Sequence, residues 1–246
     1  MKNTGKTSKN GAKVRESASL GRLARIAIAC CSIAVLAAFA IILIIPASRE
    51  VFKKLSTEHP YIMGFVKFAL LATVGEVLAL RIRKKEWALP VYVVWRLLIW
   101  GLIGVAITFM MNFFKSGVAG MMESGRLPAP GEGFGQDLLR AFYTAALMNL
   151  TFGPVFMAFH KCTDKTLDLR AEGVKKPGLH GVLKAVDWEQ FISFTVLKTI
   201  PFFWVPAHTL TFLLPDSYQV IAAAALSIAL GIILSLKTGR EKKHGS

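Results

Sequence analysis

Long runs of apolar residues alternate with short polar linkers along most of this chain. Six of the runs reach or approach the length of about 20 apolar residues that a helix needs to cross the hydrocarbon core of a bilayer. We therefore predict an all-α fold: an integral membrane helical bundle with about six transmembrane helices. The predicted spans are Leu23–Ile45, Tyr61–Leu80, Pro90–Phe114, Leu138–Phe159, Trp188–Trp204 and Tyr218–Leu236.

The positions of Lys and Arg predict how these spans are oriented. If the amino terminus lies inside, 21 of the 30 Lys and Arg residues fall on the inner side, five fall on the outer side and four lie in or beside spans. Because inner linkers are enriched in Lys and Arg, both termini are predicted to be inside (N-in/C-in). The basic linkers are expected to contact anionic lipid headgroups, which explains the charge without nucleic acid. A homo-oligomer is compatible with this pattern.

Composition indicates one bundle with short tails. The chain is 54% hydrophobic, and its linkers are too short to bury a separate soluble core. We predict a disordered basic tail over residues 1–20, a single transmembrane bundle over 21–240 and a polar tail over 241–246. The first apolar run exceeds the about 7 to 15 residues of a signal-peptide core, so it is expected to remain as an anchor. The predicted location is the cell (inner) membrane; the basic start also fits an organellar presequence.

Glycine and proline predict three local features. The Gly/Pro-rich stretch from Ser116 to Gly135 is expected to be an irregular external loop. Residues Arg49–Glu58, between two prolines, are predicted to form a short interfacial helix. Pro201 and Pro206 each lack a backbone donor, so the fifth span is predicted to be kinked.

Charged and polar residues inside the spans are the candidate functional residues. Glu76 is the only carboxylate well inside a span, where an unpaired charge costs at least ~2.5 kcal/mol. Arg96 lies at a similar depth in the next span, so we predict a Glu76–Arg96 ion pair; Arg96 could instead extend to the inner headgroups. Lys198 lies near the midplane, facing either water in a cavity or backbone carbonyls. Asn149 completes the predicted polar seam, whereas Lys67 is expected to extend to the outer headgroups.

The sequence gives no support for an enzyme or for a bound cofactor. It contains no GxSxG, phosphate-binding loop or HExxH motif. The five histidines are scattered over separate linkers, so no metal site is predicted. The three cysteines lack metal-ligand spacing and are expected to be reduced and inert.

Three stretches carry residues in the order of a known set of motifs. They are an HP pair followed by Gly-Glu, a D-x-x-R followed by GPV and a later K-x-x-D, and a Trp/Pro-rich segment before the last span. The residues are His59, Pro60, Gly75 and Glu76; Asp137, Arg140, Gly153, Pro154, Lys161 and Asp164; and Trp204, Pro206, Pro215 and Tyr218. The chain thus resembles a divergent member, with extra spans, of the membrane-protein family that includes the 22-kDa peroxisomal membrane protein and the mitochondrial inner-membrane protein Mpv-seventeen.

The resemblance implies a channel-like protein that passes small solutes or ions passively, or that supports membrane homeostasis. It also makes the mitochondrial inner membrane or the peroxisomal membrane the alternative location. On this interpretation Glu76, Arg96, Asn149 and Lys198 line the path. The alternative is a non-conducting structural or assembly protein whose intramembrane charges hold its helices together.

Overall fold

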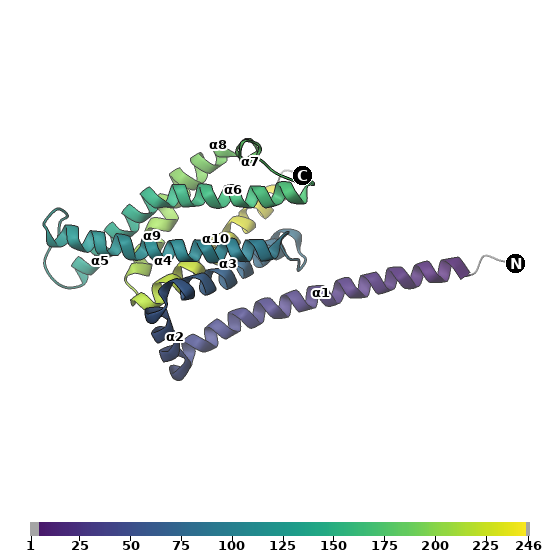
Figure 1. The fold of residues 1–246 in the computed structure, drawn as a ribbon, viewed down its shortest axis with the longest axis horizontal. Helices are drawn as coiled ribbons and strands as arrows, with labels where there is room; N and C mark the ends of the chain where they lie inside the picture. The colour runs from purple at the N-terminus through teal and green to yellow at the C-terminus, as the bar shows by residue number, and fades with distance from the viewer. Residues whose placement is uncertain (1–4, 245–246) are drawn as a thin grey trace.

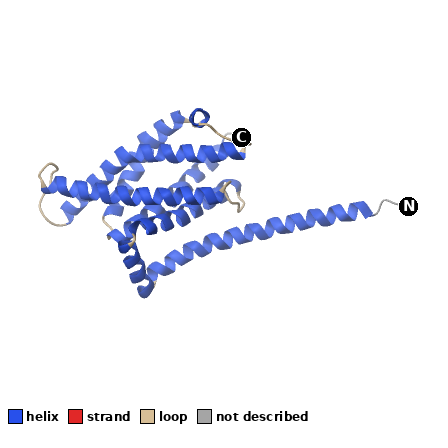
Figure 2. Cartoon of the chain, in the orientation of Figure 1, coloured by secondary structure: helices blue, strands red, loops and turns tan. Residues whose placement is uncertain are grey.

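The computed structural model describes the backbone of residues 5–244 and the side chains of residues 21–231, and helices joined by loops and turns make up this region. No strand occurs in that region (Figure 2), so the predicted all-α class is confirmed. The helices are α1 (Gly5–Ile44), α2 (Pro46–Glu58), α3 (Pro60–Lys84), α4 (Val93–Glu123), α5 (Phe134–Leu147), the π-helix η1 (Met148–Phe152), α6 (Gly153–Ala171), α7 (Leu179–Ala185), α8 (Trp188–Gln190), the π-helix η2 (Phe191–Trp204), α9 (Val205–Phe212) and α10 (Asp216–His244).

Four helical segments within the described residues are long and apolar enough to cross a membrane. They are Gly21–Ile44, Pro60–Lys84, Val93–Glu123 and Phe134–Ala171. The fifth predicted span is continuous helix from α8 to α9 but is not among the four, and the described apolar part of α10, Asp216–Gly231, is shorter. The last residues of the predicted sixth span lie outside the described side chains. Length and composition thus indicate a membrane location.

Successive long segments run antiparallel through the bundle (Figure 1). The start of α1, the α3–α4 linker, the α6–α7 linker and the end of α10 lie toward one end, which we call the basic end. Arg81, Arg83 and Lys84 occupy the last turn of α3 there. The α1–α2 turn, the α4–α5 loop and the α9–α10 turn lie toward the opposite end.

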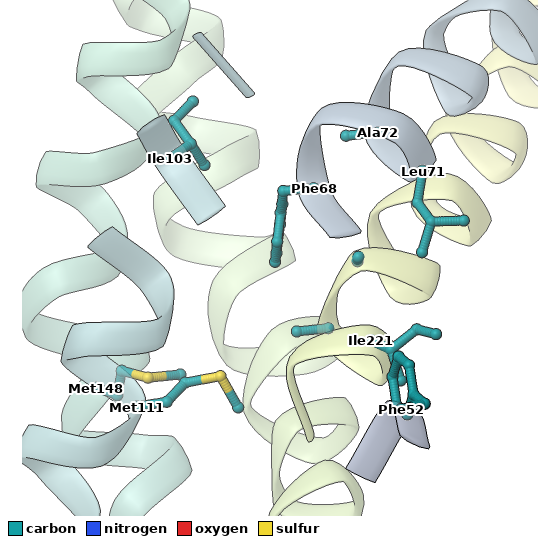
Figure 3. Packing of buried hydrophobic residues seen from close by; sticks show 10 residues of the cluster. Phe52, Phe68, Leu71, Ala72, Ile103, Met111, Met148 and Ile221 are labelled. Carbon is teal, nitrogen blue, oxygen red and sulfur yellow. The ribbon is translucent and has the colours of Figure 1, made fainter. Parts of the chain in front are cut away.

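Helix α3 is the centre of the bundle, where it packs against α4 and α10. Its backbone lies so close to α4 that a Cβ atom on Gly104 would overlap the carbonyl oxygen of Gly64 and the side chain of Phe68. Small residues allow such close approach, which is a main source of attraction between helices in lipid. The buried hydrophobic cluster surrounds this contact, and Figure 3 shows Met111 and Met148 facing each other within it.

Helix α1 is largely separate from the bundle (Figure 1). Among its described side chains, from Gly21 onward, those that pack against the hydrophobic cluster lie near its carboxyl end, such as Leu36 and Phe39. Its start at Gly5 means that helix covers most of the stretch predicted as a disordered tail. A helix nucleated by the apolar run extends at low cost through the preceding residues, because each added residue gains a hydrogen bond.

Two local predictions need correction. The expected loop from Ser116 is helical as far as Glu123, because burial of Val118 and Met122 outweighs the helix-propensity cost of glycine, about 1 kcal/mol each. Lys67 does not extend to the headgroups: it is 2% exposed, and its Nζ donates to Ser56 Oγ at 2.8 Å. Helix α2, predicted correctly as a helix, packs against α3 and contributes this hydroxyl.

Replacing Gly104 with Ala should destabilise the protein, because the new methyl group would force α3 and α4 apart. Overpacking of this kind costs about 1–3 kcal/mol. Gly117→Ala, in the same helix, is the matched control, since a Cβ there meets nothing within 4 Å. It should leave stability unchanged or raise it by up to about 1 kcal/mol. Denaturation of the purified protein in detergent measures both, and equal midpoints would contradict the close contact.

Candidate functional site

Three helices bring five ionisable side chains to one place inside the bundle. Glu76 comes from α3, Arg96 from the first turn of α4, and His160, Asp164 and Asp168 from α6. The spacing of four residues along α6 places the last three on one face of that helix. We call these five residues the charge cluster.

Arg96 is the hub of the charge cluster. Its Nη1 donates to Asp164 Oδ1 and its Nη2 to Asp168 Oδ1, both at 2.8 Å, and its Nε donates to the Val91 carbonyl at 3.0 Å. Nη1 also lies 3.6 Å from Glu76 Oε2. The Arg96 side chain is only 9% exposed. Three carboxylates therefore surround one guanidinium, so the acidic groups of the cluster outnumber the basic one.

Trp100, one turn further along α4, orders the other side of the cluster. Its indole Nε1 donates to Glu76 Oε1 at 2.7 Å. Its ring lies against the imidazole of His160, with 4.2 Å between the ring centroids. His160 Nε2 is 3.4 Å from Asp164 Oδ2. His160 Nδ1 is buried without a hydrogen-bond partner among the described residues.

The charge cluster separates two cavities. The larger, of about 600 Å³, combines polar and charged residues with aromatic and methionine side chains, among them Phe152, Phe156, Met157, Phe191 and Trp204, and we call it the aromatic cavity. The second, of about 560 Å³, lies beside the α3–α4 linker, and we call it the linker cavity. Trp100, His160, Asp164 and Asp168 line both cavities.

Both cavities lie toward the basic end of the bundle. The linker cavity reaches Leu89 and Pro90, and the aromatic cavity reaches Ala185 and Asp187, which are linker or helix-end residues. The inner wall of the aromatic cavity includes Asn149, whose Oδ1 accepts a hydrogen bond from His208 Nδ1 at 3.0 Å.

Toward the opposite end the side chains are closely packed. Thr108, Met111, Val118 and Thr144 are all at most 2% exposed. We call the half that contains the two cavities the open half, and the half that contains these buried side chains the closed half.

The predicted contact between Glu76 and Arg96 is confirmed, although Asp164 and Asp168 are the closer partners of Arg96. Asn149 is buried in the wall of the aromatic cavity. Lys198 does not join these residues, because its side chain is exposed and lines neither cavity. The depth of a residue along a span does not show which way its side chain points around the helix axis. The buried residues of η2 are Phe191, Thr199, Ile200 and Trp204, and Lys198 lies on the exposed face of the same helix.

The residues that carried the family resemblance are only partly brought together. Glu76 and Asp164 lie in the charge cluster, and Gly153, Lys161 and Trp204 line the aromatic cavity. Gly75 lines the linker cavity. The remaining motif residues lie outside both cavities: His59, Pro60, Asp137, Arg140, Pro154, Pro206, Pro215 and Tyr218. The candidate seam derived from the sequence lacked Trp100, His160, Asp168 and His208. The spacing of His160, Asp164 and Asp168 was the signal that marks one polar face.

No family model, curated protein or solved structure matches this chain. The family resemblance therefore stays a prediction.

Removing the hub should destabilise the bundle. Arg96→Met leaves three carboxylates without their cation, and breaking a buried ion pair in this way costs about 3–5 kcal/mol. Arg25→Met is the control, because the Arg25–Glu86 bridge is exposed on both sides and such pairs contribute about 0–1 kcal/mol. Unfolding in detergent measures both variants. Adding Asp168→Asn to Arg96→Met should recover part of the loss; equal losses for Arg96→Met and Arg25→Met would contradict the hub role.

Proposed function

We propose that this protein passes small solutes across a membrane in a channel-like, passive way, with the aromatic cavity as the solute-accessible part of the path. The observation that carries the proposal is a cavity of about 600 Å³ inside a bundle of candidate spans, with a charge cluster in its wall. Pockets that hold small organic molecules usually enclose about 300–1,000 Å³ and combine apolar walls with a few polar groups.

The charge cluster supports this proposal and favours cationic or polar solutes. Ionisable residues inside membrane spans usually face a cavity or a transport path, because burying them in lipid is costly. Glu76, Asp164 and Asp168 share one guanidinium, so the wall between the two cavities is rich in carboxylate oxygens. A solute entering from the basic end would meet these oxygens together with the basic side chains of the cavity walls, Lys161 and Lys165 in the aromatic cavity and Arg83 and Lys84 in the linker cavity.

Passage requires the closed half of the bundle to open. The contact between Met111 and Met148 and the Asn149–His208 hydrogen bond lie at the boundary between the two halves. Methionine is flexible, and apolar constrictions can open and close a path by wetting and drying. The π-helices η1 and η2 border the aromatic cavity, and irregular turns of this kind are frequent at functional sites.

The alternative is a non-conducting structural or assembly protein. One observation favours it: every nitrogen of the Arg96 guanidinium has a protein acceptor, so the cluster can hold α4 to α6 without any solute. The family resemblance favours passage of small solutes instead. Anionic lipids at the basic linkers and a homo-oligomer belong to both proposals.

Filling the aromatic cavity should block solute flux. Thr195→Trp adds bulk on the cavity side of η2, whereas Ile192→Trp, on the exposed face of the same helix, is the matched control. Efflux of a size series of small cations and neutral polyols from liposomes should fall at least several-fold with Thr195→Trp and stay near the original rate with Ile192→Trp. If liposomes with the unmodified protein release every solute, at every voltage, no faster than empty liposomes, the non-conducting alternative is favoured.

We further propose six crossings with both termini inside, which the antiparallel course of the segments supports. In a variant whose three cysteines are replaced by Ser, a cysteine at Ser124, in the α4–α5 turn, should react with a membrane-impermeant maleimide in intact cells. A cysteine at Lys175, in the α6–α7 linker, should react only after the membrane is opened. The reverse pattern would overturn the orientation, and labelling of both positions in sealed cells would overturn the number of crossings.

A further inference from the structure

Three side chains of the charge cluster lie close enough together to bind one metal ion, an arrangement that the passage of solutes does not require. One ligand atom each from Glu76, His160 and Asp164 lies within 4.8 Å of the other two. His160 and Asp164 are one turn apart on α6, the spacing that lets two helical side chains reach a common ion. Glu76 approaches from α3 and completes a three-sided group of one nitrogen and two oxygen donors.

Each of these side chains keeps an atom that could bind a metal ion and makes no hydrogen bond with the protein among the described residues. Arg96 takes Oδ1 of Asp164, which leaves Oδ2 on the side of His160. Trp100 takes Oε1 of Glu76, while Oε2 lies 3.6 Å from Arg96 Nη1, beyond hydrogen-bond length. His160 has a buried Nδ1 without a partner among the described residues. His160 Nε2 is the nitrogen that faces Asp164, at 3.4 Å from Oδ2. The three side chains are therefore held close together, and each has an atom without a hydrogen bond within the described part of the chain.

The formal charge of the cluster matches a divalent cation. Glu76, Asp164 and Asp168 bring three negative charges, and Arg96 brings one positive charge. Buried charges in proteins are paired or coordinate metals, because leaving them uncompensated is costly. An ion with two positive charges, held by Glu76 and Asp164, brings the formal sum to zero.

The donor set also selects the kind of ion. Imidazole favours zinc and its neighbours among the first-row transition metals, whereas magnesium and calcium prefer oxygen donors throughout. Three protein donors with an open position are typical of zinc sites that keep a water molecule. Arg96 and Trp100 act as the supporting shell here, because each holds the second oxygen of a ligand carboxylate. Both cavities border the group, which gives an ion a route from the basic end.

We propose that Glu76, His160 and Asp164 bind a divalent transition-metal ion of the zinc class, which joins α3 to α6 at the wall between the two cavities. The proposal does not depend on the passage of solutes: a protein that conducts without metal, or one that binds metal without conducting, separates the two.

Isothermal titration of the full-length, chelator-treated protein in detergent with zinc chloride tests the site. The three cysteines are replaced by Ser throughout, so that thiolates do not bind zinc. We expect one zinc ion per chain and much weaker binding of magnesium. Glu76→Gln, His160→Gln and Asp164→Asn should each weaken zinc binding at least about tenfold, since loss of supporting partners alone commonly has that effect. Asp187→Asn, at the rim of the aromatic cavity, is the control and should bind zinc unchanged.

X-ray absorption at the zinc edge adds a measurement that needs no ligand variant. The bound ion should show only nitrogen and oxygen neighbours, at about 2.0–2.2 Å. Absence of stoichiometric zinc binding would overturn the proposal. The proposal would also be overturned if the three ligand variants bound zinc as tightly as Asp187→Asn does, because the ion would then lie elsewhere on the chain. Circular dichroism of each variant shows whether its helices are intact.

Discussion

A guanidinium buried among helices must find acceptors on its neighbours, because an uncompensated charge in such surroundings costs several kcal/mol. Arg96 meets this requirement with two carboxylates of α6, the carbonyl of Val91 and a longer contact with Glu76 of α3. The relative positions of α3, α4 and α6 therefore depend in part on this one side chain. Residues of these helices form part of the walls of both cavities, so the shape of the cavities depends on this side chain too.

Close packing of α3 against α4 works together with this ion pair. The Gly64–Gly104 contact brings the two backbones together without intervening side chains, and this close approach lets Trp100 reach Glu76. A carboxylate with a short indole hydrogen bond has a fixed direction, and Trp100 also supports the ring of His160. Packing by small residues and pairing of charges thus stabilise the same interface, one by dispersion and the other by electrostatics.

The bundle divides into an open half and a closed half. The proposed solute path and the proposed ion site both lie in the open half. The open half contains the two cavities, the charge cluster and the proposed ion site, all within reach of the basic end. The closed half contains fully buried side chains such as Thr108 and Thr144. A solute can enter the first without crossing the second, so transport would require a change in the packing near Asn149 and His208.

Hydrophobic pattern and charge were enough to predict the all-α class, four of the candidate spans and the contact between Glu76 and Arg96. These features depend on local composition and on distance along a helix axis, which can be counted from the residues. Tertiary structure alone decided that Lys67 is buried under α2, that Lys198 faces outward and that His160 and Asp168 join the cluster. Such outcomes depend on how each helix is rotated about its axis, and that rotation is set by neighbouring helices that lie far away in the chain.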